Sequence, residues 1–437
     1  MPQTHNRSLG PTGWAVYLGC SWTWCIGMFL PALLIRDLGL WGYVVFAVPN
    51  VVGAAAMGWV LKSPESSRKL AEDHRQAAVL FSQVTLLFHA FWFSWLFSWA
   101  FNNSGWPKWV WIVFVAIPVF GGTLLNKVHP SGIRTTQLRA FGTWVVSAAF
   151  LLALAIGDPI VPSPSQTLQS VSFSWDVVWL LPASAFGFLF CPYLDLTFLR
   201  ARTESESKRD SRFAFGAGFG IFFFSMIVLT VLYAGPIAVL TDRNSDAIVQ
   251  IATWAGVLLV LHMGLQTLFT AEVHMTEMHR ERSPTNGPYG WFDVWWAFAF
   301  FFGLMFGSAK IDESWLLVGQ SYMLGGEIGY RAFLTYYGLI FPAYVYLNIW
   351  NIRGRCLRTR TPRSLRVTII AIALASPFFF MGFFVRDERY IPAGVAILLL
   401  AKLFTGPGAT GCSQPVSGAA DPGARLAEDG QAVAPGT

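Results

Sequence analysis

The chain has 437 residues, of which 54% are hydrophobic and only 12% are charged, and its mean hydropathy is +0.49. Soluble domains carry about 25% charged residues, so this composition excludes a soluble domain and predicts a polytopic membrane protein. The formal net charge is +6 at pH 7. The basic residues lie in short stretches between apolar segments, which membrane topology explains without a nucleic-acid partner.

The first apolar segment, Gly13–Ile35, is long enough to cross a bilayer but is interrupted near its middle. Between Gly19 and Gly27 it carries two cysteines, a serine, a threonine and two tryptophans. Polar groups at membrane depth persist only where they are buried in protein or line a cavity. The interruption therefore predicts a functional site in the middle of the membrane.

Eleven further apolar segments predict transmembrane helices, because open sheet edges cannot face lipid and the segments are too long for barrel strands. A second interruption, made up of Ala185–Phe188 and Cys191–Tyr193, lies in the middle of the sixth segment. After the second segment, residues 63–76 begin with Ser-Pro-Glu, which is typical of a helix N-terminus. In chain order the twelve segments are Gly13–Ile35, Leu40–Leu61, Ala77–Phe101, Trp106–Leu125, Arg139–Ile156, Trp175–Phe198, Phe213–Leu240, Ile251–Glu272, Trp291–Ser308, Ile328–Trp350, Val367–Val385 and Ile391–Phe404.

The distribution of basic residues tests this segmentation. With a cytoplasmic N-terminus, 23 of the 30 Lys and Arg residues fall on the cytoplasmic side. Such an excess is the positive-inside signal, and one missed or invented segment would have reversed the side of every later loop. The sequence therefore predicts an integral protein of the bacterial inner membrane whose N- and C-termini are cytoplasmic.

The twelve segments can be grouped as five, five and two. The second group starts from the opposite side of the membrane, so the two groups of five are predicted to be inverted repeats. Each group opens with an interrupted segment and continues with a glycine-rich one. The predicted parts are a cytoplasmic N-terminus (1–12), a first five-helix repeat (13–156), an extracytoplasmic loop (157–174), a second five-helix repeat (175–350), two additional helices (351–404) and a disordered cytoplasmic tail (405–437).

Short motifs near the N-terminus carry a family resemblance. Ser8–Gly10, the interrupted segment, Phe29–Pro31 and Gly39–Gly42 resemble the start of sodium:solute symporter-like proteins. The five-five-two plan resembles the wider amino acid–polyamine–organocation superfamily, with the inverted-repeat fold of the bacterial leucine transporter. The plan covers nearly the whole chain, whereas the motifs cover only its beginning. The resemblance implies an all-α bundle and a secondary transporter of a small organic solute, amino acid-like or another polar metabolite.

The resemblance also implies a position for the solute. In that fold the solute lies at mid-membrane between the unwound parts of the first and sixth helices. The physics of the chain agrees, because unwound turns release backbone N–H and C=O groups and add the dipoles of half-helices. The alternative for each indole is a packed or lipid-facing aromatic ring. The residues carried over are Ser21, Trp22, Thr23, Trp24 and Gly27 with Phe186, Gly187, Phe188 and Tyr193.

Sodium-coupled relatives bind an ion between the first helix and the inner half of the eighth. The eighth segment here offers Gln266, Thr267 and Thr270, but it lacks the adjacent pair of hydroxyl residues that supplies oxygens in such relatives. Sodium coupling, proton coupling and simple exchange therefore stay open as alternatives, and no other cofactor is expected. By analogy with relatives, Arg7 and Glu272 occupy the positions of an inner-gate ion pair.

Ionisable residues inside membrane segments are functional candidates because their burial is costly. Asp195, near the inner end of the sixth segment, is a candidate coupling or gating carboxylate. The alternative is a juxtamembrane acid paired with Arg200 or Arg202. His89 and His262 are the deepest histidines, and each is either a proton relay or a hydrogen-bonded structural residue.

Two other functions are compatible with the sequence. A membrane-embedded transferase would use His89 or His262 with Asp195, although no segment carries a clustered catalytic set. A non-transporting sensor or scaffold of the same fold would have a collapsed central site. His274 and His279 are five residues apart, which places them on different faces of a helix, so no metal site is predicted. The prediction is a transporter rather than an enzyme.

Overall fold

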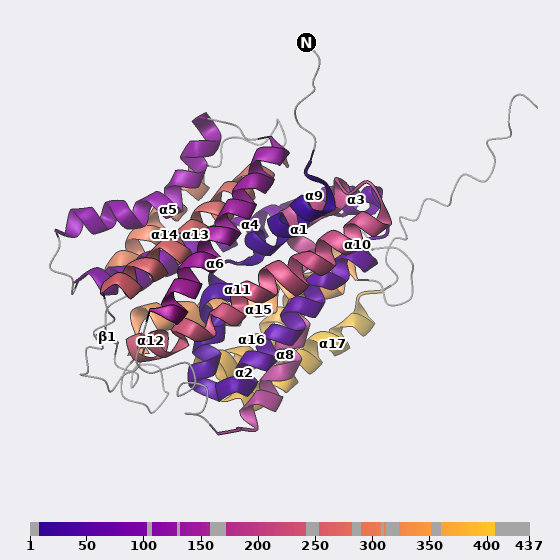
Figure 1. The fold of residues 1–437 in the computed structure, drawn as a ribbon. Helices are drawn as coiled ribbons and strands as arrows, with labels where there is room; N and C mark the ends of the chain where they lie inside the picture. Colours follow the sequence, from indigo (N-terminus) through magenta and orange to yellow (C-terminus); the bar gives the residue numbers. More distant parts are fainter. Residues whose placement is uncertain are drawn as a thin grey trace, which may run out of the picture.

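The computed structural model describes residues 8–102, 107–128, 132–157, 172–241, 253–281, 290–306, 310–311, 323–350 and 360–406. These residues form a bundle of helices packed side by side (Figure 1). Among them, the only extended structure is an antiparallel pair of two-residue strands, β1 (Lys310–Ile311) and β2 (Met323–Leu324). The predicted all-helical class is therefore confirmed.

The bundle presents an apolar surface to its surroundings. Eight of the described helical segments are long and apolar enough to cross a bilayer. Large apolar side chains on the outside remain exposed, including Met305 at 81%, Leu400 at 60% and Ile117 at 58%. Such continuous apolar exposure is unfavourable in water and favourable in lipid. The prediction of a polytopic integral membrane protein is confirmed at this level.

The first apolar segment is broken, as the sequence predicts. α1 (Gly10–Trp22) ends at Thr23, and α2 (Cys25–Val60) begins after Trp24, whose backbone is extended with φ −109° and ψ −168°. Small polar side chains satisfy carbonyls of the last turn of α1. Ser21 Oγ donates to Leu18 O, and Thr23 Oγ1 donates to Gly19 O. Serine and threonine thereby compete with continuation of the helix.

The glycines that flank the predicted interruption lie inside helices and serve packing. Gly19 in α1 and Gly27 in α2 both approach the π-helical segment η2 (Gly218–Phe223). A Cβ atom on Gly19 would lie 2.6 Å from Phe222 Cβ, and one on Gly27 would lie 3.1 Å from Phe223 Cε2. Small residues at these points let the helices approach closely. The break itself is confined to Thr23 and Trp24.

α2 contains both the end of the first predicted segment and all of the second except Leu61. Its 36 residues span about 54 Å if straight, which exceeds the roughly 30 Å hydrocarbon core. The helix bends at Gly39, where φ is 65° and ψ is −156°. Glycine adopts this conformation without a Cβ clash. The predicted gap between Ile35 and Leu40 is therefore a bend between two helical arms and not an extended loop.

The sixth predicted segment is also broken, but later than the sequence indicates. α8 (Asp176–Phe190) continues through Ala185–Phe188, where an interruption was predicted, so that part of the prediction is wrong. The chain then forms the 3₁₀ turn η1 (Cys191–Leu194) and resumes as α9 (Leu196–Thr203). Pro192 explains the position, because proline lacks an N–H group and its ring clashes with the carbonyl four residues earlier.

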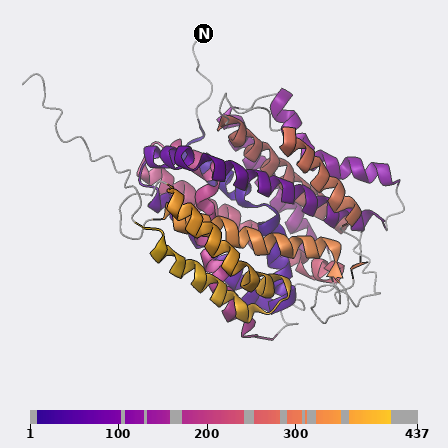
Figure 2. The same ribbon diagram turned by 180° about the vertical axis from the view of Figure 1, so that it is seen from behind.

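Apart from η6, the remaining helices overlap the predicted apolar segments or, in the case of α3, form the short segment after the second of them. α3 has a capping box at Ser63. α2 lies beside α8, α4 beside α14, and α13 beside α5 and α6 (Figure 1). From behind, α16 and α17 lie side by side in gold (Figure 2). The bounds are α3 (Pro64–Asp73), α4 (Arg75–Asn102), α5 (Lys108–Val128), α6 (Ile133–Ile156), α10 (Lys208–Ala217), α11 (Phe224–Leu229), α12 (Val231–Thr241), α13 (Thr253–Arg280), α14 (Gly290–Phe306), α15 (Gly325–Tyr344), η4 (Val345–Ile349), α16 (Pro362–Phe379), η5 (Phe380–Phe384), η6 (Glu388–Tyr390), α17 (Ile391–Ala401) and η7 (Lys402–Phe404).

Candidate functional site

The two helix breaks lie against each other. The Trp22 ring, at the end of α1, is 4.9 Å from the Phe198 ring in α9, measured between centroids. Thr197 Oγ1, at the start of α9, is 3.1 Å from Ser21 Oγ. Each break leaves backbone N–H and C=O groups outside the regular helical hydrogen-bond pattern. Polar backbone from two distant parts of the chain is thereby collected at one place.

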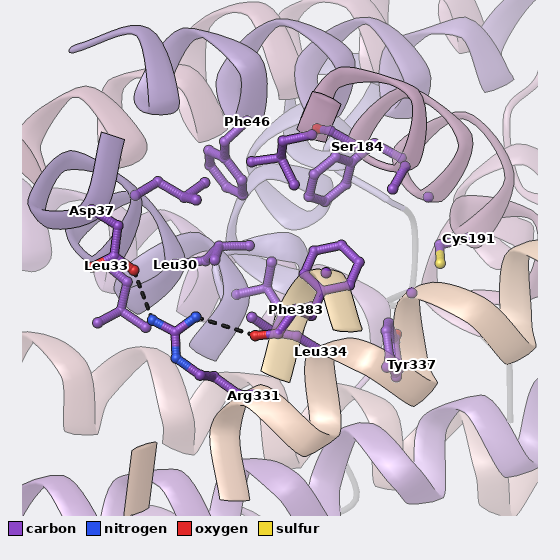
Figure 3. A pocket seen from close by; sticks show the side chains of 18 of the residues that line it. Leu30, Leu33, Asp37, Phe46, Ser184, Cys191, Arg331, Leu334, Tyr337 and Phe383 are labelled. Carbon is purple, nitrogen blue, oxygen red and sulfur yellow. Dashed lines mark hydrogen bonds and ion pairs between the residues drawn. The ribbon is translucent and has the colours of Figure 1, made fainter. Parts of the chain in front are cut away.

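A cavity of about 100 Å³ extends away from the breaks. Figure 3 shows Cys191 and Tyr337 at one end of it, and Asp37 and Arg331 at the other. The walls between these ends are mostly apolar. They are formed by α2, α8, α15 and η5, and the apolar wall residues are Ile26, Leu30, Leu33, Leu34, Leu38, Phe46, Leu180, Ala183, Phe188, Leu334 and Phe383.

Charged side chains close the far end of the cavity. We call Arg36, Asp37, Glu327, Arg331 and Arg386 the Asp37 cluster. Asp37 accepts from all three arginines, at 2.7, 2.7 and 2.8 Å. Glu327 accepts from Arg36 at 2.7 Å and from Arg331 at 2.9 Å. The cluster ties α2 to α15 and to the turn before η6, and its five formal charges sum to a single positive charge.

Glu388 adds a further carboxyl group to this end of the cavity. It is the first residue of η6, between the helical segments α16–η5 and α17. Burial raises the pKa of Glu388 from its ordinary value of 4.5 to about 7, and the Asp176 carboxylate contributes in the same direction. The group therefore changes its charge near neutral pH, beside a cavity that contains Arg331.

The structure places four of the predicted solute-site residues on the cavity lining, namely Trp22, Trp24, Gly187 and Phe188. Trp24 lies 5.4 Å from Tyr337, another lining residue, between ring centroids. The cavity thus brings together the first break and the middle of α8. The other predicted solute-site residues do not belong to its lining: Ser21, Thr23, Gly27, Phe186 and Tyr193.

The charged and hydroxyl residues of the lining were not among the residues predicted to bind solute. Asp37, Arg331 and Glu388 lie at the borders of apolar segments, where the sequence counts them only as loop charges. Ionisable residues that border apolar segments are a signal for a functional site. That signal could have found Asp37, but the sequence does not show that Arg331 lies next to it.

The candidate ion-coupling residues of α13 do not gather at one point. Gln266 Nε2 donates to Ser147 Oγ at 3.0 Å, towards α6. Thr267 Oγ1 lies 3.1 Å from His89 Nε2, towards α4. Thr270 is buried, and its hydroxyl has no hydrogen-bond partner among the described residues. Gln266 and Thr267 therefore point to different neighbours, on α6 and α4.

Asp195 lies at the second break and is completely buried. Its Oδ1 atom accepts from Thr197 N at 2.8 Å, so Asp195 caps α9, and the same atom is 2.7 Å from Thr197 Oγ1. The alternative of a juxtamembrane ion pair is wrong. Arg200 binds Glu277 at 3.0 Å, and the Arg202 guanidinium donates to a backbone carbonyl.

The predicted inner-gate pair cannot be placed as a pair. Arg7 lies outside the described residues. Glu272 forms an ion pair with Arg139, which joins α13 to α6. This contact holds two helices together near the end of α13 that the sequence assigns to the cytoplasmic side.

No family model matches the sequence, and no curated protein matches it either. The contact between the two breaks and the cavity beside it are therefore the basis for a functional conclusion.

Proposed function

We propose that the chain is a secondary transporter that moves a small organic solute across a membrane by alternating access. The observation that carries this proposal is the contact between two broken helices beside a cavity, with Ser21 and Thr197 hydroxyls 3.1 Å apart. Secondary transporters typically bind substrates and coupling ions at discontinuous helices near the bilayer midplane. A non-transporting scaffold of the same fold would share the two breaks, so the cavity beside them is the feature that favours a transporter.

The proposal includes twelve membrane crossings in a five-five-two arrangement with inverted repeats. The breaks support it, because they fall in the first helix of each proposed group, in α1–α2 and in α8–α9. With both termini in the cytoplasm, α1 enters from the inside and α8 from the outside. The Asp37 cluster then lies at the outer end of the cavity. The proposed location is a bacterial inner membrane, and the lipid bilayer is the surrounding partner.

The cavity favours a small solute with an apolar part and an ionic end. At about 100 Å³ it is smaller than an apolar cavity of about 150 Å³ that accepts benzene, so the walls must move to admit a larger solute. Apolar residues form most of its surface. At the charged end, Arg331 suits a carboxylate, and Glu388 or Asp37 suits an ammonium group. An amino acid-like solute meets these requirements.

Ion pairs on the outer and on the inner side of the site can close it reversibly to each side of the membrane. On the outer side, the Asp37 cluster links α2 to α15. On the inner side, Arg200 of α9 binds Glu277 of α13 at 3.0 Å. Rigid-body movement of α1 and α9 away from α13 would break the inner contact and leave the outer one intact. Alternate opening of the two closures is the proposed transport cycle.

A membrane-embedded transferase is the less favoured function. His89 and His262 are 2% and 1% exposed, and neither belongs to the lining of the cavity. Asp195 is also absent from that lining. A catalytic histidine must reach its substrate within hydrogen-bonding distance. A non-transporting scaffold is less favoured because the breaks border a cavity and not a collapsed centre.

The proposal is tested by a thermal-shift screen of the purified protein with amino acids, organic acids and quaternary amines, followed by uptake of the stabilising compounds into liposomes. A solute at 100 times its dissociation constant stabilises a protein by about 2.7 kcal/mol. We expect at least one stabilising compound to accumulate in liposomes. Gly187→Trp should abolish both effects by filling the cavity, because a side chain at Gly187 starts in open space. Stabilisation without any uptake would reject transport and support the scaffold.

A further inference from the structure

A chain of three hydroxyl and carboxyl groups crosses the contact between the two breaks. We propose that Asp195 is a proton-binding residue, that its proton completes this chain, and that the proton is exchanged with water when the breaks separate. The coupling of this proton to a solute rests on the proposed transport function. The proton site itself does not, because it follows from the contacts of the described residues.

The first argument is the burial of Asp195 without a counter-ion. The residue is 0% exposed, and its Oδ2 atom has no hydrogen-bond partner among the described residues. The two arginines of α9, the helix that Asp195 caps, are engaged elsewhere, Arg200 with Glu277 and Arg202 with a backbone carbonyl. An ionised carboxylate in such a place is costly unless something neutralises it. A bound proton does so without any further group.

The second argument is a count of hydrogen atoms. Asp195 Oδ1 and Thr197 Oγ1 are 2.7 Å apart, Thr197 Oγ1 and Ser21 Oγ are 3.1 Å apart, and Ser21 Oγ is 3.1 Å from Leu18 O. These three contacts need three hydrogen atoms, but the two hydroxyls supply only two. A proton on Asp195 Oδ1 supplies the third. Asp195 then donates to Thr197, Thr197 to Ser21, and Ser21 to Leu18 O.

The charged and titratable groups around Asp195 do not replace this proton. His274 of α13 is close enough for an electrostatic interaction with Asp195, and its Nδ1 atom lies 3.2 Å from Ser82 Oγ. The two nearby glutamates of α13 already have arginine partners. The titratable groups that interact electrostatically with Asp195 or His274 from the surrounding elements are Tyr17 of α1, His89 of α4, Glu277 of α13 and Tyr337 of α15.

The chain also links proton binding to the position of the helices. Ser21 belongs to α1 and Thr197 to α9, so separation of the breaks cuts the chain between them. Without the contact between Thr197 and Ser21, the hydrogen-bond chain that the Asp195 proton completes no longer exists. Protonation forms an O–H bond on Oδ1 with a proton taken from water. Release returns the proton to water on the side to which the breaks open.

The test is a pH titration of the purified protein by infrared difference spectroscopy, which detects the C=O stretching band of a protonated carboxyl group. We expect one buried carboxylic-acid band that D195N removes and that D293N, at an exposed carboxylate, retains. Asparagine caps helices as well as aspartate, so D195N should keep the fold of α9. T197V is a second variant that keeps the backbone donor. It should move the band to higher frequency, because the hydroxyl partner is lost.

Two results would overturn the proposal. One is a set of carboxylic-acid bands that is identical in the wild type and D195N. The other is loss of the band at constant pH when choline chloride is replaced by sodium chloride, which would assign the site to sodium. No solute is used, so failure of this titration and failure of the transport proposal are distinguishable. A band without uptake keeps the proton site and rejects transport.

Discussion

The close contact between α2 and α8 gives the sharpest test of the packing. A Cβ atom on Gly53 would lie 2.2 Å from Phe188 O and 2.7 Å from Phe188 C, both backbone atoms. Ordinary contact begins near 3.4 Å, so Gly53→Ala forces the two helices apart by about 1 Å. Overpacking of this kind lowers the free energy of unfolding by about 1–3 kcal/mol, and the higher helix propensity of alanine raises it by about 1 kcal/mol.

The matched control is Gly187→Ala in α8, only one residue before Phe188. A Cβ atom there would meet nothing within 4 Å, because it points into the cavity. Only the higher helix propensity of alanine then affects stability, so this variant should be as stable as the wild type or more stable by up to about 1 kcal/mol. We therefore expect the free energies of unfolding of the two variants to differ by about 1–3 kcal/mol, with Gly53→Ala the less stable.

The assay is unfolding in detergent micelles, followed by tryptophan fluorescence and compared with the wild type. Equal stability of the two variants would refute the described contact between α2 and α8. A Gly187→Ala variant that is the less stable of the two would refute the assignment of Gly187 to the cavity.

Three other variants test separate parts of the structure. Arg331→Met should lower the free energy of unfolding by about 3 kcal/mol, because Asp37 loses a buried partner; a loss below about 1 kcal/mol in the same assay would contradict the cluster. The pKa of Glu388 lies above its ordinary value in the folded protein, so stability should fall as pH rises from 4.5 to about 7, and melting of Glu388→Gln should lack this slope. Identical pH profiles would reject the burial of that carboxyl group. Ser63→Ala removes a side chain that accepts a hydrogen bond from Ser66 N, so the stability of α3 should fall by about 1 kcal/mol. Hydrogen exchange should then show faster amide exchange in α3 and not in α4.

Local chemistry explains what the sequence could predict. Helices follow from long apolar segments, and the first break follows from Ser21 and Thr23, whose hydroxyls bind carbonyls of their own helix. The position of the second break depends on Pro192, which disrupts the helical turn before it. Gly187, which the sequence analysis included in the interruption, lies inside a continuous helix. Gly187 has room around it because it lines a cavity, and sequence alone cannot distinguish that reason from a break.

The site could be predicted only in part because packing decides which helix faces meet. Trp22 and Trp24 belong to a recognisable local interruption. Arg331 and Glu388, in contrast, reach the cavity from α15 and η6, roughly 300 residues or more later in the chain, and nothing near them in the sequence indicates the contact with Asp37. The pattern of apolar residues does not show which face of a membrane helix is buried in the protein, because the buried and the lipid-facing sides are both apolar.

Cys191 offers the most direct test of alternating access, because it lies on the cavity lining at the second break. Cys20, Cys25 and Cys191 are all buried, but Cys20 and Cys25 do not belong to that lining. The measurement is labelling by a membrane-impermeant thiol reagent in right-side-out and in inside-out vesicles, with Cys191→Ser as the control for other thiols. Alternating access predicts labelling of Cys191 from both sides, slowed by a bound solute. Labelling from one side only, or from neither, would contradict it.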